Sequence, residues 1–239
     1  MTKMRKYHRI LLKLSGEALA SENNSIEPKT LDKVAEIVKS VLDLDIEIAI
    51  VIGGGNIFRG KALVQKGINR VTGDHMGMLA TVINALALAD NFSKHQIKNV
   101  VMSGFAIGGG VCEEFNHTRA KHLLSQKTVT IFSAGTGSPC FTTDTGATLR
   151  AIEIGADAVF KATKVDGVYS SDPLKNPQAS RYKSLSFDEA ISKNLQIMDT
   201  AAFAMCRENG VEICVFSMLD DNNTLLEILN GKPLGTIIS

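Results

Sequence analysis

The segment SAGTGSPCFTTDT, residues 133–145, joins an apolar run that ends at Phe132 to an amphipathic run that begins near Asp144. Its glycines let the backbone pass close to a ligand, and exposed N–H groups in such a turn can converge on an anion. Asp144 stands where a helix would begin, which suits a helix N-cap or a catalytic carboxylate. The segment is therefore predicted to be a strand-to-helix loop, either a plain polar connection or a ligand site.

Other loops of the same kind also follow short apolar runs, which predict buried strands. They come after residues 10–14, 46–52 and 158–161 and read SG (15–16), GGGN (53–56) and ATKVDGVYSSDP (162–173). Since ligands bind at the carboxyl ends of parallel strands, these loops are expected to share one site. Lys13, near the end of the first run, is costly there unless it has an anionic partner or reaches the surface.

Strand-like and helix-like segments alternate along the whole chain. Strands are also predicted at 100–102, 129–132, 211–216 and 236–238, and helices near 28–42, 72–89, 118–125, 144–154, 186–193, 198–208 and 224–230. Such alternation is typical of βαβ units in an α/β fold with a mainly parallel sheet. A chain of 239 residues without an evident linker is expected to form one domain.

The overall charge excludes some classes of partner. Lys and Arg number 26 against 25 Asp and Glu, so the basic excess of a nucleic-acid-binding protein is missing and any anion site must be local. Neither a signal peptide nor a membrane-spanning run is found, so no membrane association is expected. The cysteines at 112, 140, 206 and 214 lack CxxC spacing, which indicates reduced thiols and a cytoplasmic protein.

Several familiar motifs fail on inspection. Residues 55–61 match the GxxxxGK of a P-loop, but Ala62 stands where a Ser or Thr hydroxyl should reach the metal. The glycine loops lack the third glycine of a dinucleotide-binding turn. Cys112, His117 and His122 lack the spacing of a structural zinc site, and no direct protein ligand for a metal is predicted.

The remaining constellation suits phosphoryl transfer, which depends on positioning and on cancelling negative charge. Glycine-loop N–H groups, Lys13, Arg59 and a Mg²⁺ ion would cancel that charge. An acceptor that is already a phosphate is anionic at neutral pH and needs no strong general base. That would account for the lack of an activated histidine or serine.

Five blocks in order resemble the bacterial uridylate (UMP) kinases of the amino-acid-kinase superfamily over nearly the whole chain. They are LLKLSGEAL (11–19), GGGNIFRG (53–60), GDHMGMLAT (73–81), AGTGSPCFTTD (134–144) and KATKVDGVYSSDP (161–173). The resemblance implies a three-layer α/β/α sandwich in which ATP, with Mg²⁺, phosphorylates UMP to give UDP and ADP for pyrimidine biosynthesis. The UMP side would lie mainly in residues 1–150 and the ATP side mainly in 151–239.

The resemblance also implies roles for individual residues. Lys13, Arg59 and Asp144 would be catalytic, with Asp144 organising Lys13 and the metal. The ATP-binding residues would be Lys13, Leu14, Ser15, Gly16, Gly55, Arg59, Thr163, Tyr169 and Asp172. The UMP-binding residues would be Gly54, Asp74, Thr136, Gly137, Ser138, Pro139, Cys140, Phe141, Thr142 and Thr143.

Members of this family are usually hexamers, and a homohexamer is expected here. GTP and UTP are candidate effectors, although loop 21–25, SENNS, lacks the glycines often found where relatives respond to GTP. The acceptor loop also departs from the family, with Gly-Ser-Pro-Cys-Phe at 137–141 in place of Gly-Asn-Pro-Phe-Phe. Two alternatives stay open: a sibling kinase acting on a small carboxylate or carbamate, and a non-catalytic nucleotide sensor.

Overall fold

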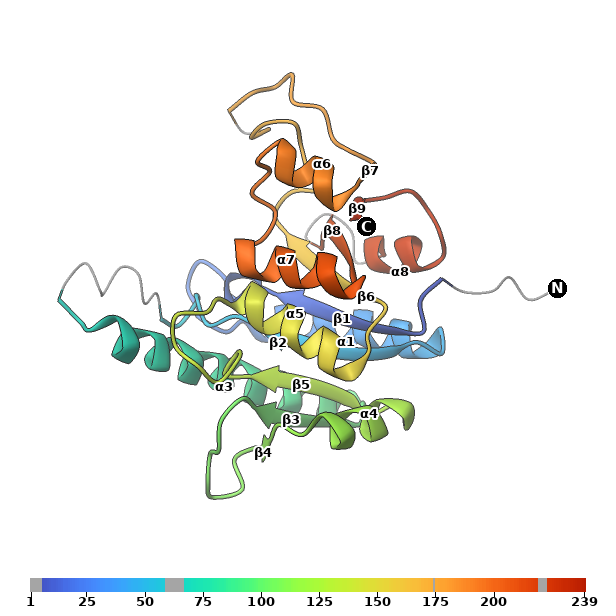
Figure 1. Cartoon of the computed structure of the whole chain (residues 1–239). Helices are drawn as coiled ribbons and strands as arrows, with labels where there is room; N and C mark the ends of the chain where they lie inside the picture. Colours follow the sequence, from blue (N-terminus) through green and yellow to red (C-terminus); the bar gives the residue numbers. More distant parts are fainter. Residues whose placement is uncertain (1–5, 59–66, 174, 219–222) are drawn as a thin grey trace.

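Strand β1 lies in the interior of a sheet whose neighbouring strands come from distant parts of the sequence (Figure 1). The computed structural model describes residues 6–58, 67–173, 175–218 and 223–239, and within these ranges nine strands form one sheet in the order β4-β3-β5-β2-β1-β6-β8-β9-β7. The strands are β1 (Arg9–Leu14), β2 (Glu47–Ile52), β3 (Asn99–Ser103), β4 (Glu113–Glu114), β5 (Val129–Ser133), β6 (Ala158–Thr163), β7 (Ser184–Leu185), β8 (Glu212–Ser217) and β9 (Thr236–Ile238). Only the β8–β9 pair among them is antiparallel, which confirms the predicted mainly parallel sheet.

Helices cover both faces of the sheet (Figure 1). They are η1, a 3₁₀ turn (Gly16–Leu19), α1 (Pro28–Asp43), α3 (Arg70–Lys94), α4 (His117–Ser125), α5 (Thr143–Ile154), α6 (Phe187–Ser192), α7 (Thr200–Asn209) and α8 (Thr224–Leu229). Local signals explain several of the ends. Pro28 opens α1, the Asn69 side chain caps α3, and Gly155 ends α5 at a φ of 67°.

The alternation of side chains along β1 divides the core into two layers. Ile10, Leu12 and Leu14 pack with α1, α3 and α8, whereas Leu11 packs on the opposite face with α4, α5 and α7. This is the expected three-layer α/β/α sandwich. The alternation also directs Lys13 toward the face that α5 covers, because residues two apart on a strand share a face.

Some short elements were not predicted. Strands β4 and β7 have two residues each, and η1 has four, lengths that leave no periodic pattern to read. Helix α3 extends beyond its predicted limits at both ends, since Asn69 and His95 rather than a change in hydrophobicity set its bounds. Among the described residues, no helix combines the length and the apolar character that crossing a bilayer would require.

Candidate active site

Two lysines lie side by side on adjacent strands at the carboxyl edge of the sheet. Lys13 of β1 and Lys161 of β6 are register partners in a parallel pair, and both side chains lie mostly buried, with 12% and 14% exposure. Neighbouring strands are about 4.8 Å apart, so two ammonium groups at such positions repel each other unless an anion lies between them.

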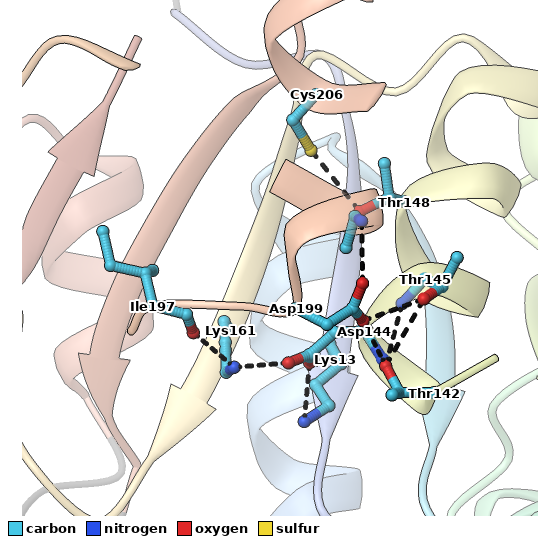
Figure 2. Close-up of polar contacts among 10 residues, drawn as sticks. Lys13, Thr142, Asp144, Thr145, Thr148, Lys161, Ile197, Asp199 and Cys206 are labelled. Carbon is cyan, nitrogen blue, oxygen red and sulfur yellow. Dashed lines mark hydrogen bonds and ion pairs between the residues drawn. The ribbon is translucent and has the colours of Figure 1, made fainter. Parts of the chain in front are cut away.

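Asp144, in the first turn of α5, supplies that anion (Figure 2). Its Oδ1 lies 3.0 Å from Nζ of Lys13, and its Oδ2 accepts a hydrogen bond of 2.7 Å from Nζ of Lys161. Asp144 is not the helix N-cap, so that alternative reading of the residue is wrong. The cap is Thr142, whose hydroxyl accepts hydrogen bonds from the backbone N–H groups of residues 144 and 145.

The side chain of Lys161 is fixed by a second contact in addition to Asp144. Its ammonium group also donates a hydrogen bond of 2.6 Å to the carbonyl of Ile197. Burial lowers the pKa of Lys161, and the attraction of Asp144 opposes that decrease. The result is a cation fixed between a carboxylate and a carbonyl.

A second carboxylate, Asp199, joins α7 to the start of α5 (Figure 2). It accepts hydrogen bonds from the Thr142 hydroxyl, from the Thr145 hydroxyl at 2.8 Å and from the backbone N–H of Ala202 at 2.9 Å. Burial raises the pKa of Asp199, but these hydrogen bonds outweigh it and hold that pKa below the usual value. Asp199 thus fixes the turn from which Asp144 projects.

A first cleft of about 270 Å³ opens beside this centre. The predicted UMP residues on its wall are Gly54, Asp74, Thr136, Ser138, Phe141, Thr142 and Thr143. Gly55, which the resemblance associates with ATP, lies on the same wall. The cleft runs from the loop after β2, past α3, to the loop after β5, so it joins segments far apart in sequence.

Tight packing shapes the glycine loops around the cleft. A Cβ at Gly16 would fall 2.3 Å from Oδ1 of Asn56, and a Cβ at Gly54 would fall 2.8 Å from Cβ of Ala80 on α3. The first loop therefore contacts the second, and the second contacts α3. Asn84, buried on α3, donates a hydrogen bond of 2.7 Å to the carbonyl of Gly53 and fixes this arrangement.

Asp74, on the wall of the first cleft, binds the loop at 137–141. Its carboxylate accepts hydrogen bonds from Nε of Arg70 at 2.9 Å and from the backbone N–H of Cys140 at 2.7 Å. Cys140 takes a φ of 72°, a left-handed conformation that costs a non-glycine residue energy and needs such a contact to hold it. Gly137, Pro139 and Cys140 belong to this loop but do not form the cleft wall.

A second cleft of about 510 Å³ lies after β6. Thr163, Tyr169 and Asp172, three of the predicted ATP residues, form part of its wall together with Lys161. The Tyr169 hydroxyl donates a hydrogen bond of 2.6 Å to Asp166. Lys161 thus belongs both to the second cleft and to the charged cluster.

The other predicted residues are placed differently. Leu14 is fully buried, so only its backbone is available to a ligand, and Ser15 caps η1 by accepting a hydrogen bond from the N–H of Ala18. Arg59 lies outside the described residues.

Comparison with known proteins now identifies the family. The family model described as "Amino acid kinase family" matches residues 8–217. The chain belongs to the amino acid kinase family.

Individual relatives resemble this chain along nearly its full length. A protein named uridylate kinase from Ruthia magnifica is 69% identical over 235 residues, covering 98% of each chain. The crystal structure titled UMP kinase from Bacillus anthracis is 39% identical, covers 98% of this chain and 96% of its own, and has a TM-score of 0.94. The structure of UMP kinase from Ureaplasma parvum is 35% identical, covers 99% and 100%, and has a TM-score of 0.91.

Two charged residues of the candidate site were not predicted from the sequence. The pattern predicts only a strand at Lys161, although a lysine in a buried strand needs an anionic partner there just as Lys13 does. Asp199 carries no local signal beyond its place before a helix, since its contacts with Thr142 and Thr145 cross more than fifty positions of sequence.

Proposed function

We propose that this member of the amino acid kinase family transfers the γ-phosphoryl group of ATP to UMP, giving UDP and ADP in pyrimidine nucleotide biosynthesis. The observation that carries the proposal is the cluster of Lys13, Asp144 and Lys161, which links the walls of the two clefts. Lys161 lines the second cleft, and Thr143, which precedes Asp144, lines the first. High identity to proteins named uridylate kinase supports UMP as the acceptor.

The chemistry follows from the charges. The phosphoryl group in flight carries negative charge over its equatorial oxygens, and fixed cations stabilise it without reorganising. Lys13 provides such a cation at the carboxyl edge, while Asp144 and Lys161 hold it in place. The UMP phosphate is already anionic, so it attacks directly in line, without a general base and without a phosphoenzyme.

Nucleotide assignments follow from the clefts. UMP occupies the first cleft, whose wall comes from residues 52–143, and the ATP nucleoside occupies the second, whose wall comes from residues 161–215. The positions of these wall residues support an acceptor side mainly in residues 1–150 and a donor side mainly in 151–239 of one domain. Asp74 accepts hydrogen bonds from the UMP ribose after exchanging its contact with Arg70 or Cys140.

Mg²⁺ enters with the ATP phosphates. No group of three or more His, Cys, Asp or Glu side chains converges among the described residues, as a dedicated protein cage for a metal would require. One buried oxygen nevertheless fits a metal carried by the substrate: Asp144 Oδ1 has an ion pair with Lys13 but no hydrogen bond from the described residues. Mg²⁺ prefers oxygen ligands and substrate phosphates, and when bound it neutralises phosphate charge.

The chain forms a homohexamer in the cytoplasm, where its nucleotides are found. Helix α3 supports assembly because large apolar side chains lie exposed along it. They are Val71, Met76, Leu79, Ile83 and Leu86. Positions 76, 79, 83 and 86 share one helical face, and an apolar face of this kind indicates contact with another copy.

Two features bear on effector binding: the uridine that UTP shares with UMP, and the loop at 21–25, which follows η1. UTP shares the uridine of the acceptor and competes for the first cleft. GTP activation is not expected, since the loop at 21–25 lacks the glycines often found where relatives respond to GTP and is held by side-chain hydrogen bonds to Glu27. Ser21 and Asn24 both donate hydrogen bonds of 3.0 Å to Glu27.

The proposal is tested by ADP release from purified protein with ATP, Mg²⁺ and a panel of acceptors. UMP should support turnover, and CMP, carbamate and small amino acids should support far less. Turnover with a carboxylate or carbamate but not with UMP would favour the sibling kinase. Nucleotide binding without turnover on any acceptor would favour a sensor.

A further inference from the structure

Arg150 is an almost fully buried cation that the reaction as described does not use. Its side chain, on α5, is 5% exposed and is distributed among several partners. Nη1 donates a hydrogen bond of 2.6 Å to Glu153, Nη2 donates one of 3.2 Å to the carbonyl of Gly135, and the guanidinium carbon lies 3.8 Å from the centre of the Phe115 ring. Glu153 balances the charge and the Phe115 ring stacks on the guanidinium, whereas the contact with Gly135 connects Arg150 to the wall of the first cleft.

The loop that receives this hydrogen bond has an unusual backbone. Gly135 and Gly137 adopt positive φ values of 55° and 83° without strain, but Ala134 has a φ of 58°, and a non-glycine residue keeps this left-handed conformation only when its surroundings impose it. Side chains from two helices hold this turn at adjacent residues. The Thr81 hydroxyl of α3 accepts a hydrogen bond of 2.7 Å from the N–H of Ala134, and Arg150 of α5 donates one to the carbonyl of the following residue, Gly135.

The geometry of the peptide bond gives the Arg150 contact its significance. A peptide is planar and trans, so the carbonyl of Gly135 and the N–H of Thr136 point in opposite directions. Holding the carbonyl toward Arg150 therefore sets the direction of that N–H. Gly135 and Thr136 both lie on the wall of the first cleft.

Close packing leaves this peptide little freedom to turn by itself. A Cβ at Gly104 would lie 3.1 Å from Nη2 of Arg150 and 3.0 Å from the carbonyl oxygen of Gly135. A Cβ at Gly146 would lie 3.0 Å from Cα of Gly135. The guanidinium and the loop thus share one small space between Gly104 and α5.

We propose that Arg150 is a positioning residue for UMP, which acts by orienting the backbone of residues 134–138 from behind the first cleft. The inference rests on the proposed assignment of that cleft to UMP. A lysine cannot replace this arginine, because a single ammonium group cannot match the planar fork that reaches Glu153 and Gly135 while stacking on Phe115.

The test compares Arg150→Met and Arg150→Lys with the matched control Glu153→Gln, which removes the negative charge beside Arg150 but leaves its contact with Gly135 in place. In steady-state assays of full-length protein, both Arg150 variants should raise the KM for UMP about tenfold or more and change the KM for ATP less than about twofold. The control should change either KM less than about twofold. In Arg150→Lys, hydrogen–deuterium exchange should accelerate in residues 133–140.

Each other result overturns the inference in a recognisable way. An unchanged KM for UMP, with unchanged exchange in residues 133–140, would show that Arg150 only stabilises the fold. An equal rise in both KM values would show a general defect. A rise in the ATP value alone would show that the cleft itself is misassigned. If Arg150→Met does not fold, the Arg150→Lys data decide.

Discussion

Lys13 and Lys161 lie side by side on adjacent parallel strands and share the carboxylate of Asp144, with each lysine paired to one of its oxygens. The arrangement follows from three simple facts: alternation along β1 and β6 directs both lysines to one face, register places them side by side, and α5 begins above them. Neither lysine would be stable there without the aspartate, and the aspartate gains its fixed orientation from both.

Replacing Lys161 tests whether the second lysine matters for turnover. Lys161→Met should lower kcat about 100-fold or more, because Asp144 loses its anchor and the cluster loses a cation. The KM for UMP should change little, since Lys161 lies on the wall of the other cleft. Lys193→Met is the matched control, because Lys193 lines the same cleft but lies exposed beside Glu189. If kcat of Lys161→Met and kcat of Lys193→Met both equal the wild-type value, Lys161 has no part in the mechanism.

Lys13→Ala and Asp144→Asn should lose most of kcat while nucleotides still bind. Lys13 is expected to act on the group in flight rather than on either bound nucleotide, so its removal affects the transition state more than binding. Rapid-quench kinetics would give the loss and calorimetry the affinities. Unchanged kcat with altered nucleotide affinity would show that both roles are misassigned.

Asp199→Asn should lower the free energy of unfolding at neutral pH by about 2 kcal/mol, the scale of hydrogen bonds to a charged group. Because the folded-state pKa of Asp199 lies below its usual value, its stabilisation is complete above the unfolded-state pKa and is lost as the pH falls through the folded-state pKa. The difference between wild type and variant should therefore shrink below about pH 4. Urea titrations over that range measure it.

Asp188→Asn is the matched control for Asp199→Asn. Asp188→Asn changes an exposed carboxylate 3.6 Å from Arg207 and should alter stability by less than about 0.5 kcal/mol at any pH. A stability difference for Asp199→Asn that stays constant through acid pH would mean that its ionisation does not stabilise the fold.

Leu79→Glu should dissociate the proposed hexamer, since it places a charge in the centre of the apolar face of α3. Light scattering coupled to size exclusion would report a smaller mass. Lys121→Glu, a change at an exposed position on α4, should give an assembly with the same mass as wild type. A monomeric wild type, or a Leu79→Glu variant of unchanged mass, would contradict the assignment of this face.

The sequence predicted those features that local pattern controls. The buried run at 10–14 with its lysine, the glycine loop at 53–55 and the helix predicted at 144–154 all appear close to their expected places. Parallel topology then brings the loops after β1, β2, β5 and β6 to one edge. The family resemblance supplied the individual residue roles, which remain predictions.

Contacts that depend on register and on distant packing could not be read in the same way. The pairing of Lys13 with Lys161 requires knowing that β1 lies beside β6, and the contact of Arg150 with Gly135 requires the path of a left-handed loop. The cap at Thr142 rather than Asp144 depends on a two-residue difference in where α5 begins, which propensity does not resolve.

Transfer of a radiolabelled γ-phosphoryl group from ATP to UMP tests the central claim most directly. With wild-type protein and Mg²⁺, label should move from ATP into UDP in step with ADP formation, and Asp144→Asn should slow that single turnover about 100-fold or more. Label released as inorganic phosphate, or no label in UDP at saturating UMP, would contradict the account.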